Sequence, residues 1–399
     1  MLKIMTWTEI GILLGFLVVL GLIFLELILR YFENQKQKRS TYYAKSNLIL
    51  ESFDNFSQEE FSFFTELTRT TSAPIIGWTL IPNYKNQIYQ TDEYGFRNNQ
   101  SKDNKKKKVI AIFGGSVAQG GYASSNEKTV SGFLEVMLKK EFDENIVVLN
   151  FAQSSFTLLQ EISLFCLVKE LYNIHLSIFI DGHNDISAEF YNNGDFFGFS
   201  KPFFGGWEKV SDTIKLDGFI TSFIRLVTRY SFVTKMLVRF LRSILRKDKR
   251  LTNSVGDFTT SINKVEQNFR QCIEVVRSNV KNSKRCAIMT LQPSIYACNQ
   301  LTKPELTFLD RFSLDRKSFY KRAYRRLREK VYLKTNRFFE TKVKDQNFYC
   351  VDFSSITEPH KTPIFCDDCH FEDRGNLLYA KHLFQIIKVQ GLLNDYEKK

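Results

Sequence analysis

The sequence has little of what several specialised protein classes need. Only 7 of its 399 residues are proline, which argues against a proline-rich stalk or linker. Hydrophobic residues make up 43% and charged residues 25%, which excludes wholesale disorder and any collagen-like or low-complexity chain. The sequence also contains no internal repeat. We therefore expect one large domain with attached segments, and a core rich in the 38 phenylalanines.

Cysteine is sparse and irregularly spaced. The seven cysteines are an odd number without a regular pattern, so the sequence does not indicate a disulfide framework. Cys366 and Cys369 form a lone Cys-x-x-Cys, and without a second pair they do not predict a zinc site. We expect ordinary packing thiols, with a local disulfide between these two as the alternative.

Acidic residues are too few to balance the basic ones. The 56 Lys and Arg residues exceed the 43 Asp and Glu residues and give a formal charge of +13. Such an excess suits nucleic acid, an anionic membrane surface or an acidic polymer as partner. No base-stacking or groove-reading motif accompanies the charge, so nucleic acid is not expected. Much of the excess lies just after residue 29, in the KKKK run at 105–108 and on two predicted helices, which favours membrane contact.

The amino terminus carries one long apolar run. Residues 10–29 match the ~20 residues that a helix needs to cross a bilayer, and the one charge, Glu26, lies near the end. A cleaved signal peptide is the main alternative, but no small-residue cleavage site follows the run. A buried core helix fits less well, because the run is apolar all round. We predict a retained single-pass anchor in residues 1–30.

The flanking charges give an orientation for this anchor. Lys3 and the terminal amine precede the run, whereas Arg30, Lys36, Lys38, Arg39 and Lys45 follow it. The positive-inside rule therefore favours a cytoplasmic body, with an extracytoplasmic body as the open alternative.

The body alternates short apolar runs with stretches of helical spacing. Helical spacing marks Val130–Glu141 and Leu158–Leu171. This alternation predicts an α/β fold with a parallel sheet covered on both faces. The expected strands are Val109–Phe113, Ile146–Asn150, Ile174–Ile180, Cys286–Leu291 and Phe348–Phe353.

Three other segments divide the chain. Residues 31–104 are expected to be a juxtamembrane and lead-in segment before a domain at 105–399. An insertion at about 187–265 interrupts the alternation and includes a basic amphipathic helix at 219–250. We expect this helix, and the basic helix at 316–330, to present a solvated face. A lid or a membrane-surface element is the alternative for 219–250.

Four motifs supply chemically useful groups at the ends of predicted elements. Gly114-Gly115-Ser116 follows the first strand, and a glycine turn there presents Ser116 at a helix start. The segment 150–155 (NFAQSS) follows the second strand, and 181–185 (DGHND) follows the third. Asp367-x-x-His370 can place a base and its orienting carboxylate on one turn. Together these motifs contain a nucleophile, oxyanion donors and a base, as acyl transfer requires.

In these motifs the chain resembles the SGNH (GDSL-type) hydrolase superfamily. The matching blocks are FGGSVAQG, NFAQSSFTLLQ, DGHND and DDCHFEDRGNLLYAKHL, and the likeness runs from about Val109 to the end. Two more stretches, GWTLIPNYKNQIYQTDEYGFRN and LQPSIY, resemble membrane-anchored and secreted bacterial members. The resemblance implies a three-layer α/β/α fold of flavodoxin-like type.

The resemblance also assigns roles to residues. It implies that Ser116 is the nucleophile, His370 the base and Asp367 the group that orients it. The oxyanion donors would be the Ser116 amide, the Ser155 amide and the Asn184 side chain.

The sequence departs from the family pattern at three positions. Gly115 stands where GDSL proteins carry Asp, and Ala152 replaces a frequent glycine. Ser155 also stands where glycine is usual, and a serine would be strained there if the backbone needs a positive φ.

The remaining polar residues receive no catalytic role. His183 occupies the variable position of its block, and Gln160 is a candidate support for the second loop. We expect exposed carboxylates at Asp368 and Asp373. His175, His360 and His382 are expected to be structural.

The expected function is a serine esterase that cleaves an ester through an acyl-enzyme on Ser116. Its substrate would be a lipid, a small ester or an O-acylated polysaccharide, and no metal or cofactor is required. Two alternatives stay open: an O-acyltransferase, or a non-catalytic SGNH-like module acting in cell-envelope polysaccharide modification.

Overall fold

The centre of the fold is a five-stranded parallel sheet with the strand order β4-β3-β5-β6-β7. The computed structural model describes residues 70–98, 108–192, 258–332, 347–355 and 363–393, except Pro74, Gln87 and Asn282, together with Gly21, Glu26, Ile28 and Tyr31. The strands are β3 (Lys108–Gly114), β4 (Ile146–Asn150), β5 (Ile174–Asp181), β6 (Cys286–Leu291) and β7 (Phe348–Asp352). The predicted parallel sheet is confirmed.

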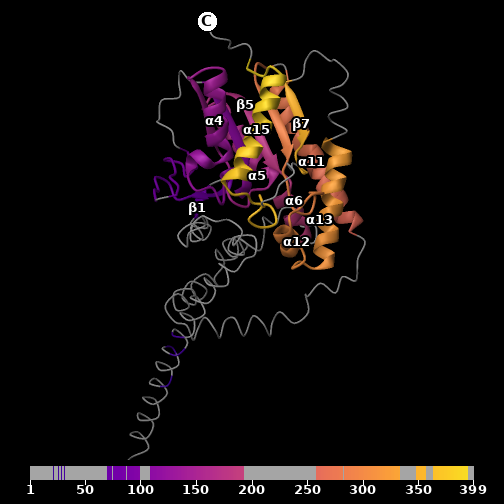
Figure 1. The fold of residues 1–399 in the computed structure, drawn as a ribbon. Helices are drawn as coiled ribbons and strands as arrows, with labels where there is room; N and C mark the ends of the chain where they lie inside the picture. Colours follow the sequence, from indigo (N-terminus) through magenta and orange to yellow (C-terminus); the bar gives the residue numbers. More distant parts are fainter. Residues whose placement is uncertain are drawn as a thin grey trace, which may run out of the picture. The chain divides into compact units, whose positions relative to one another are not determined.

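Helices cover both faces of this sheet, as the nearly continuous burial of β3, β4 and β5 requires. On one face, α4 (Val130–Glu141) packs against α15 (Asp373–Val389). On the other, α11 (Thr259–Val280) contacts both α5 (Leu158–Val168) and β6. Two more helices, α6 (His183–Asn192) and α13 (Leu314–Leu327), pack outside α11, and Figure 1 shows α11 and α13 side by side in orange. The result is three layers, α/β/α.

Four short helical segments join these larger elements. The helix α3 (Ser116–Gln119) follows β3, and the 3-10 helix η2 (Asn126–Lys128) precedes α4. The helix α12 (Lys303–Leu309) lies between β6 and α13, and the π-helical turn η3 (Arg328–Tyr332) extends α13.

The strand order places a switch point between β3 and β5. The connection after β3 returns through α4 on one face, whereas the connection after β5 runs through α6 and α11 on the other. In open α/β sheets, ligands bind outside the carboxyl ends of the strands at such a point. Ser116 follows β3 and Asn184 follows β5, so two of the predicted site residues flank it.

Phenylalanine fills the centre of the core. The Phe113 ring stacks on Phe179, with ring centroids 5.0 Å apart, and on Phe151 at 5.5 Å. Phe165 packs edge-on against Phe113 and Phe179 from α5. The abundance of this residue type therefore serves the packing between the sheet and α5.

Residues 70–98 pack onto the loops that follow the strands. They begin with the antiparallel pair β1 (Thr70–Ala73) and β2 (Gly77–Leu80). The Asn98 side chain accepts a hydrogen bond from the Asn150 backbone N–H at 2.7 Å. Part of the predicted lead-in segment thus contributes directly to the folded body.

Arg97 joins this segment to the turn after α3. Its buried guanidinium donates to the Asn126 side chain at 2.8 Å and to the backbone carbonyls of Gly120 at 2.5 Å and Ala123 at 3.2 Å. Burial lowers the pKa of Arg97, but acceptors surround the cation and hold its protons. Sequence analysis assigned no role to this residue.

Several sequence predictions concern residues outside the described ranges. The run at 10–29 is described only at Gly21, Glu26 and Ile28, and none of the helix at 219–250 is described. Within the described ranges, no helix combines the length and the apolar character that crossing a membrane takes. Of the predicted insertion at 187–265, the first residues belong to α6 and the last to α11, and 193–257 lie outside the described ranges. His360 is also outside them.

Candidate active site

A tight turn brings Ser116 to the carboxyl end of β3. A Cβ on Gly114 would lie 2.4 Å from the Ala118 Cβ and 2.9 Å from the Ile180 carbonyl oxygen, so only glycine fits. The backbone then enters α3 at Ser116, and Gly120 ends the helix with a φ of +84°. Such a short, confined helix fixes the direction of the Ser116 side chain.

The structure brings Ser116, His370 and Asp367 together although Ser116 and His370 are 254 positions apart in sequence. The Ser116 Oγ lies 2.6 Å from the His370 Nε2. The His370 Nδ1 lies 2.7 Å and 2.9 Å from the two carboxylate oxygens of Asp367. All the spacings are those of hydrogen bonds, and they run from the hydroxyl through the ring to the carboxylate.

Electrostatics keep Asp367 ionised. Burial disfavours its charge, but the attraction of His370 and hydrogen bonds from the ring and from the backbone N–H groups of Cys369 and His370 hold its pKa down to about 2. Burial in turn disfavours the charged form of His370, yet the Asp367 carboxylate outweighs it and raises the His370 pKa. His370 is thereby made a stronger base.

Tyr122 is a neighbour of this group that sequence analysis missed. Its ring packs edge-on against the His370 ring, with centroids 5.6 Å apart. Burial, the negative charge of Asp367 and a hydrogen bond to that carboxylate raise the Tyr122 pKa, so the phenol stays protonated. No motif marked Tyr122, because its contact with His370 depends on the fold.

Asn184 lies against the turn that carries Ser116. Its Nδ2 is 2.1 Å from where a Cβ on Gly115 would stand, so the amide occupies the space that a side chain would need. The same Nδ2 donates to the Phe156 carbonyl oxygen at 2.8 Å, which fixes its direction. A primary amide has a second N–H, which leaves a donor for the space beside Ser116.

The third predicted oxyanion donor, the backbone N–H of Ser155, sits in a left-handed backbone conformation. Ser155 has a φ of +64°, the region that favours glycine. The strain anticipated for a serine at this position is therefore present.

Ser155→Gly is expected to increase the free energy of unfolding by about 1 kcal/mol, because glycine adopts this φ without steric cost. Urea denaturation followed by circular dichroism measures this change in the free energy of unfolding. The neighbouring Ser154→Gly, at a residue without a positive φ, is the control and should be destabilising. Equal destabilisation by both variants would argue against strain at Ser155.

The loop that carries Ser155 is held by residues 70–98. The Leu80 N–H donates to the Gln153 Oε1 at 3.1 Å, and the Gln153 Nε2 donates to the Gly95 carbonyl oxygen at 3.0 Å. The Trp78 indole donates to the Ser154 carbonyl oxygen at 3.0 Å. Gln160 supports the loop as suggested from sequence, because it forms a capping box with Thr157 at the start of α5.

The prediction that Asp368 is an exposed carboxylate is wrong. Its side chain is 14% exposed and accepts hydrogen bonds from Arg316 at 2.5 Å and Tyr296 at 3.3 Å. His183 faces the same oxygen at 3.5 Å and is buried, which lowers its pKa despite the nearby charge. Arg316 therefore does not belong to a purely solvated face, because its guanidinium also packs over the Phe312 ring at 4.3 Å.

The remaining polar predictions have mixed outcomes. Asp373 is only partly exposed and accepts hydrogen bonds from the Ser124 backbone N–H and hydroxyl at 2.9 and 2.5 Å. His382 donates to the Leu378 carbonyl oxygen within α15, a structural contact. All seven cysteines are free thiols, and only Cys166 is exposed. The alternative of a Cys366–Cys369 disulfide is not realised.

Three carboxyl groups from α5, the end of β5 and the start of α6 are buried. Glu161 on α5 neighbours Asp181 at the end of β5, and Asp185 accepts from the Leu158 backbone N–H at 3.2 Å. In the part of the chain that the structure describes, none of the three forms an ion pair with Lys, Arg or His. Burial raises all three pKa values, that of Asp185 to about 7. The burial of Glu161 and Asp181 side by side therefore favours the protonated form of the pair over two charges.

Two groups of side chains in the described ranges could in principle offer metal ligands. One contains His183, Asp368 and Cys369, and the other Asp367, Cys369 and His370. In the first, the Arg316 guanidinium already neutralises Asp368 and would repel a cation. In the second, Asp367 and His370 bind each other and Ser116. The side chains of both groups are therefore already engaged with partners within the protein.

No protein-family model matches this chain, and no curated protein matches it. The chain is similar in structure to several GDSL-type hydrolases. A Bacteroides fragilis protein assigned as an acylhydrolase is 13% identical, with 74% of this chain and 92% of that chain covered and a TM-score of 0.35. A lipase from a goat rumen metagenome is 9% identical, with 73% and 99% covered and a TM-score of 0.38. A protein from Desulfitobacterium hafniense assigned to the G-D-S-L family is 10% identical, with 70% and 99% covered and a TM-score of 0.36. These scores are too low to add to what the geometry of the site shows.

Proposed function

We propose that the protein is a serine ester hydrolase of the SGNH type that works through an acyl-enzyme on Ser116. One observation carries the proposal: the Ser116 Oγ, the His370 ring and the Asp367 carboxylate form one continuous hydrogen-bonded chain, with steps of 2.6 and 2.7 Å. A buried serine has no structural need for a histidine that is itself oriented by an ionised carboxylate.

The chemistry then follows in two halves. The Ser116 Oγ attacks the acyl carbon while its proton passes to the His370 Nε2, and the Asp367 carboxylate stabilises the resulting imidazolium. The negative charge that develops on the carbonyl oxygen is met by the Ser116 and Ser155 backbone N–H groups and the Asn184 amide. His370 returns the proton to the departing alkoxide. Water then gives a proton to His370 as it attacks the acyl carbon of the acyl-enzyme. His370 returns this proton to the Ser116 Oγ as the bond from the acyl carbon to Oγ breaks and the carboxylic acid leaves.

A fluorophosphonate probe tests this assignment. We expect the probe to form one covalent adduct with the wild-type chain and none with Ser116→Ala, because only an activated serine displaces the fluoride. Labelled protein is read by in-gel fluorescence and intact mass. Ser163→Ala is the control, since its hydroxyl only donates to its own helix at the Leu159 carbonyl oxygen. An unlabelled wild type would favour the non-catalytic alternative, and a labelled Ser116→Ala would move the nucleophile elsewhere.

We further propose that residues 10–29 anchor the chain in a membrane, with the body in the cytoplasm as the flanking charges favour. Labelling of the exposed Cys166 thiol shows on which side of the membrane the body lies. A membrane-impermeant maleimide should label the chain only after the cells are permeabilised, and Cys166→Ser should remove that label. Labelling in intact cells would place the body outside the cytoplasm.

A further inference from the structure

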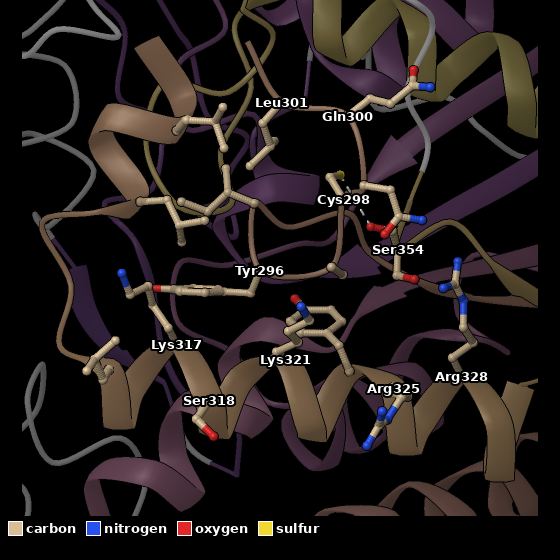
Figure 2. A pocket seen from close by; sticks show the side chains of 17 residues that line it. Tyr296, Cys298, Gln300, Leu301, Lys317, Ser318, Lys321, Arg325, Arg328 and Ser354 are labelled. Carbon is tan, nitrogen blue, oxygen red and sulfur yellow. Dashed lines mark hydrogen bonds between the residues drawn. The ribbon is translucent and has the colours of Figure 1, made fainter. Parts of the chain in front are cut away.

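A pocket of about 860 Å³ opens between α12, α13 and the segment that follows β6. Figure 2 shows Lys317 and Lys321 on the side of α13 that faces Tyr296, Cys298 and Leu301. Sequence analysis placed Ile295 and Tyr296 of this pocket in the LQPSIY stretch and its cations on a solvated basic helix, but it assigned no ligand to them. The volume is in the range that holds a small organic ligand.

One wall of the pocket is strongly basic. Lys317, Lys321, Arg325 and Arg328 line it, and no Asp or Glu does. Neighbouring carboxylates pair with the first and last of these: Lys317 contacts Asp310 at 3.3 Å, and Arg328 contacts Asp352 at 2.5 Å. Among the described residues, Lys321 and Arg325 have no such partner. Two positive charges at the pocket are therefore uncompensated.

The remaining lining is apolar and partly open to solvent. Leu306 is 49% exposed and Leu314 is 79% exposed, and Leu301 and Leu309 also line the pocket. Open leucines and cations without carboxylate partners therefore line the same pocket. They are complementary to a molecule with an anionic head and an apolar chain.

The pocket and the candidate active site share a wall. Tyr296 lines the pocket, and its hydroxyl donates to the Asp368 carboxylate at 3.3 Å, next in sequence to Asp367. The Ser294 hydroxyl donates to the Asp368 carbonyl oxygen at 3.0 Å. The pocket nevertheless uses none of the residues assigned to ester cleavage, so its ligand can be tested independently.

We propose that this pocket binds an amphiphilic phosphate, a single apolar chain with a phosphate head, such as a lipid phosphate. Lys321 and Arg325 bind the phosphate oxygens, and the leucines of α12 and the start of α13 cover the chain. This assignment stands whether or not Ser116 is a nucleophile.

Binding is tested on the full chain in phosphatidylcholine nanodiscs. The probes are hexyl phosphate and inorganic phosphate, and the broadening of their phosphorus NMR lines measures binding. Hexyl phosphate should bind at least about tenfold more tightly than inorganic phosphate, because part of its chain leaves water. Empty nanodiscs correct for partition into the bilayer. Equal affinities would reduce the pocket to a site for free phosphate and overturn the proposal.

Substitutions locate the site. The double variant Lys321→Ala, Arg325→Ala should weaken both probes by about tenfold. Leu306→Asn should weaken hexyl phosphate by about fivefold and leave inorganic phosphate unchanged. The control removes the same charge at two exposed lysines away from the pocket, Lys281→Ala with Lys284→Ala, and should change neither affinity. Absence of hexyl phosphate binding, or equal weakening by the control pair, would overturn the proposal.

Discussion

Asp367→Asn lowers kcat/KM for ester hydrolysis by roughly 10³- to 10⁴-fold, the loss typical of this change in serine triads. An asparagine keeps the size of the side chain, and its Oδ1 still accepts from the Cys369 and His370 backbone N–H groups. Its Nδ2, however, is a donor that faces the His370 Nδ1. The Nδ1 must therefore be unprotonated, so the His370 ring carries its proton on Nε2. In that tautomer His370 cannot accept the Ser116 proton. Hydrolysis of p-nitrophenyl acetate measures the loss.

The same variant should change the pH profile in a defined direction. In the wild type, burial lowers the His370 pKa, but the Asp367 charge and hydrogen bond outweigh it and raise the value. Without that charge, burial dominates and the His370 pKa falls. The unprotonated base therefore forms at lower pH, so the residual activity should rise at lower pH than in the wild type. Asp315→Asn, at an exposed carboxylate, controls for the loss of one charge. An unchanged rate and profile in Asp367→Asn would remove this carboxylate from the site.

Asp185→Asn makes the folded state less sensitive to pH. The pKa of Asp185 is raised to about 7 by burial, whereas an unfolded aspartate titrates near its ordinary value. Between these two values the folded state binds a proton that the unfolded state has lost. The free energy of unfolding therefore falls as pH rises through this window, by about 1.4 kcal/mol per pH unit for one proton. Asparagine binds no proton at this position in either the folded or the unfolded state. Its side-chain oxygen can still accept the hydrogen bond from the Leu158 N–H.

Urea denaturation at a series of pH values from 4 to 8 measures this slope. The variant should gain most stability relative to the wild type at the highest pH. Glu161 and Asp181 keep a slope of the same sign, because their pKa values are also raised, so the variant should flatten the dependence without abolishing it. Parallel curves for wild type and Asp185→Asn would mean that Asp185 is ionised in the folded state.

Local sequence pattern was enough to predict the sheet. The predicted strands Ile146–Asn150 and Cys286–Leu291 agree with β4 and β6 at both ends, because strands buried on both faces are continuous apolar runs bounded by polar residues. The helix predicted at Leu158–Leu171 ends earlier, at Val168. The motif residues Ser116, Asp367 and His370 also meet, although their roles stay predictions.

The surroundings of the site could not be predicted in the same way. Arg97 and Asp368 have partners 23 and 52 residues away in sequence, and no period or spacing links such pairs. Arg97 looks like an ordinary surface cation until the fold closes around it. Asp368 stands beside a recognisable motif, and its burial follows from α13 packing over the loop. Predicting either needs the contacts between elements.

The close approach of Asn184 to Gly115 makes these two positions epistatic. A side chain at 115 and the present position of the Asn184 amide exclude each other, since the two would be 2.1 Å apart. An aspartate at position 115 would displace the Asn184 amide, which we propose as an oxyanion donor. A side chain at position 115 therefore requires a simultaneous change that moves or shortens Asn184.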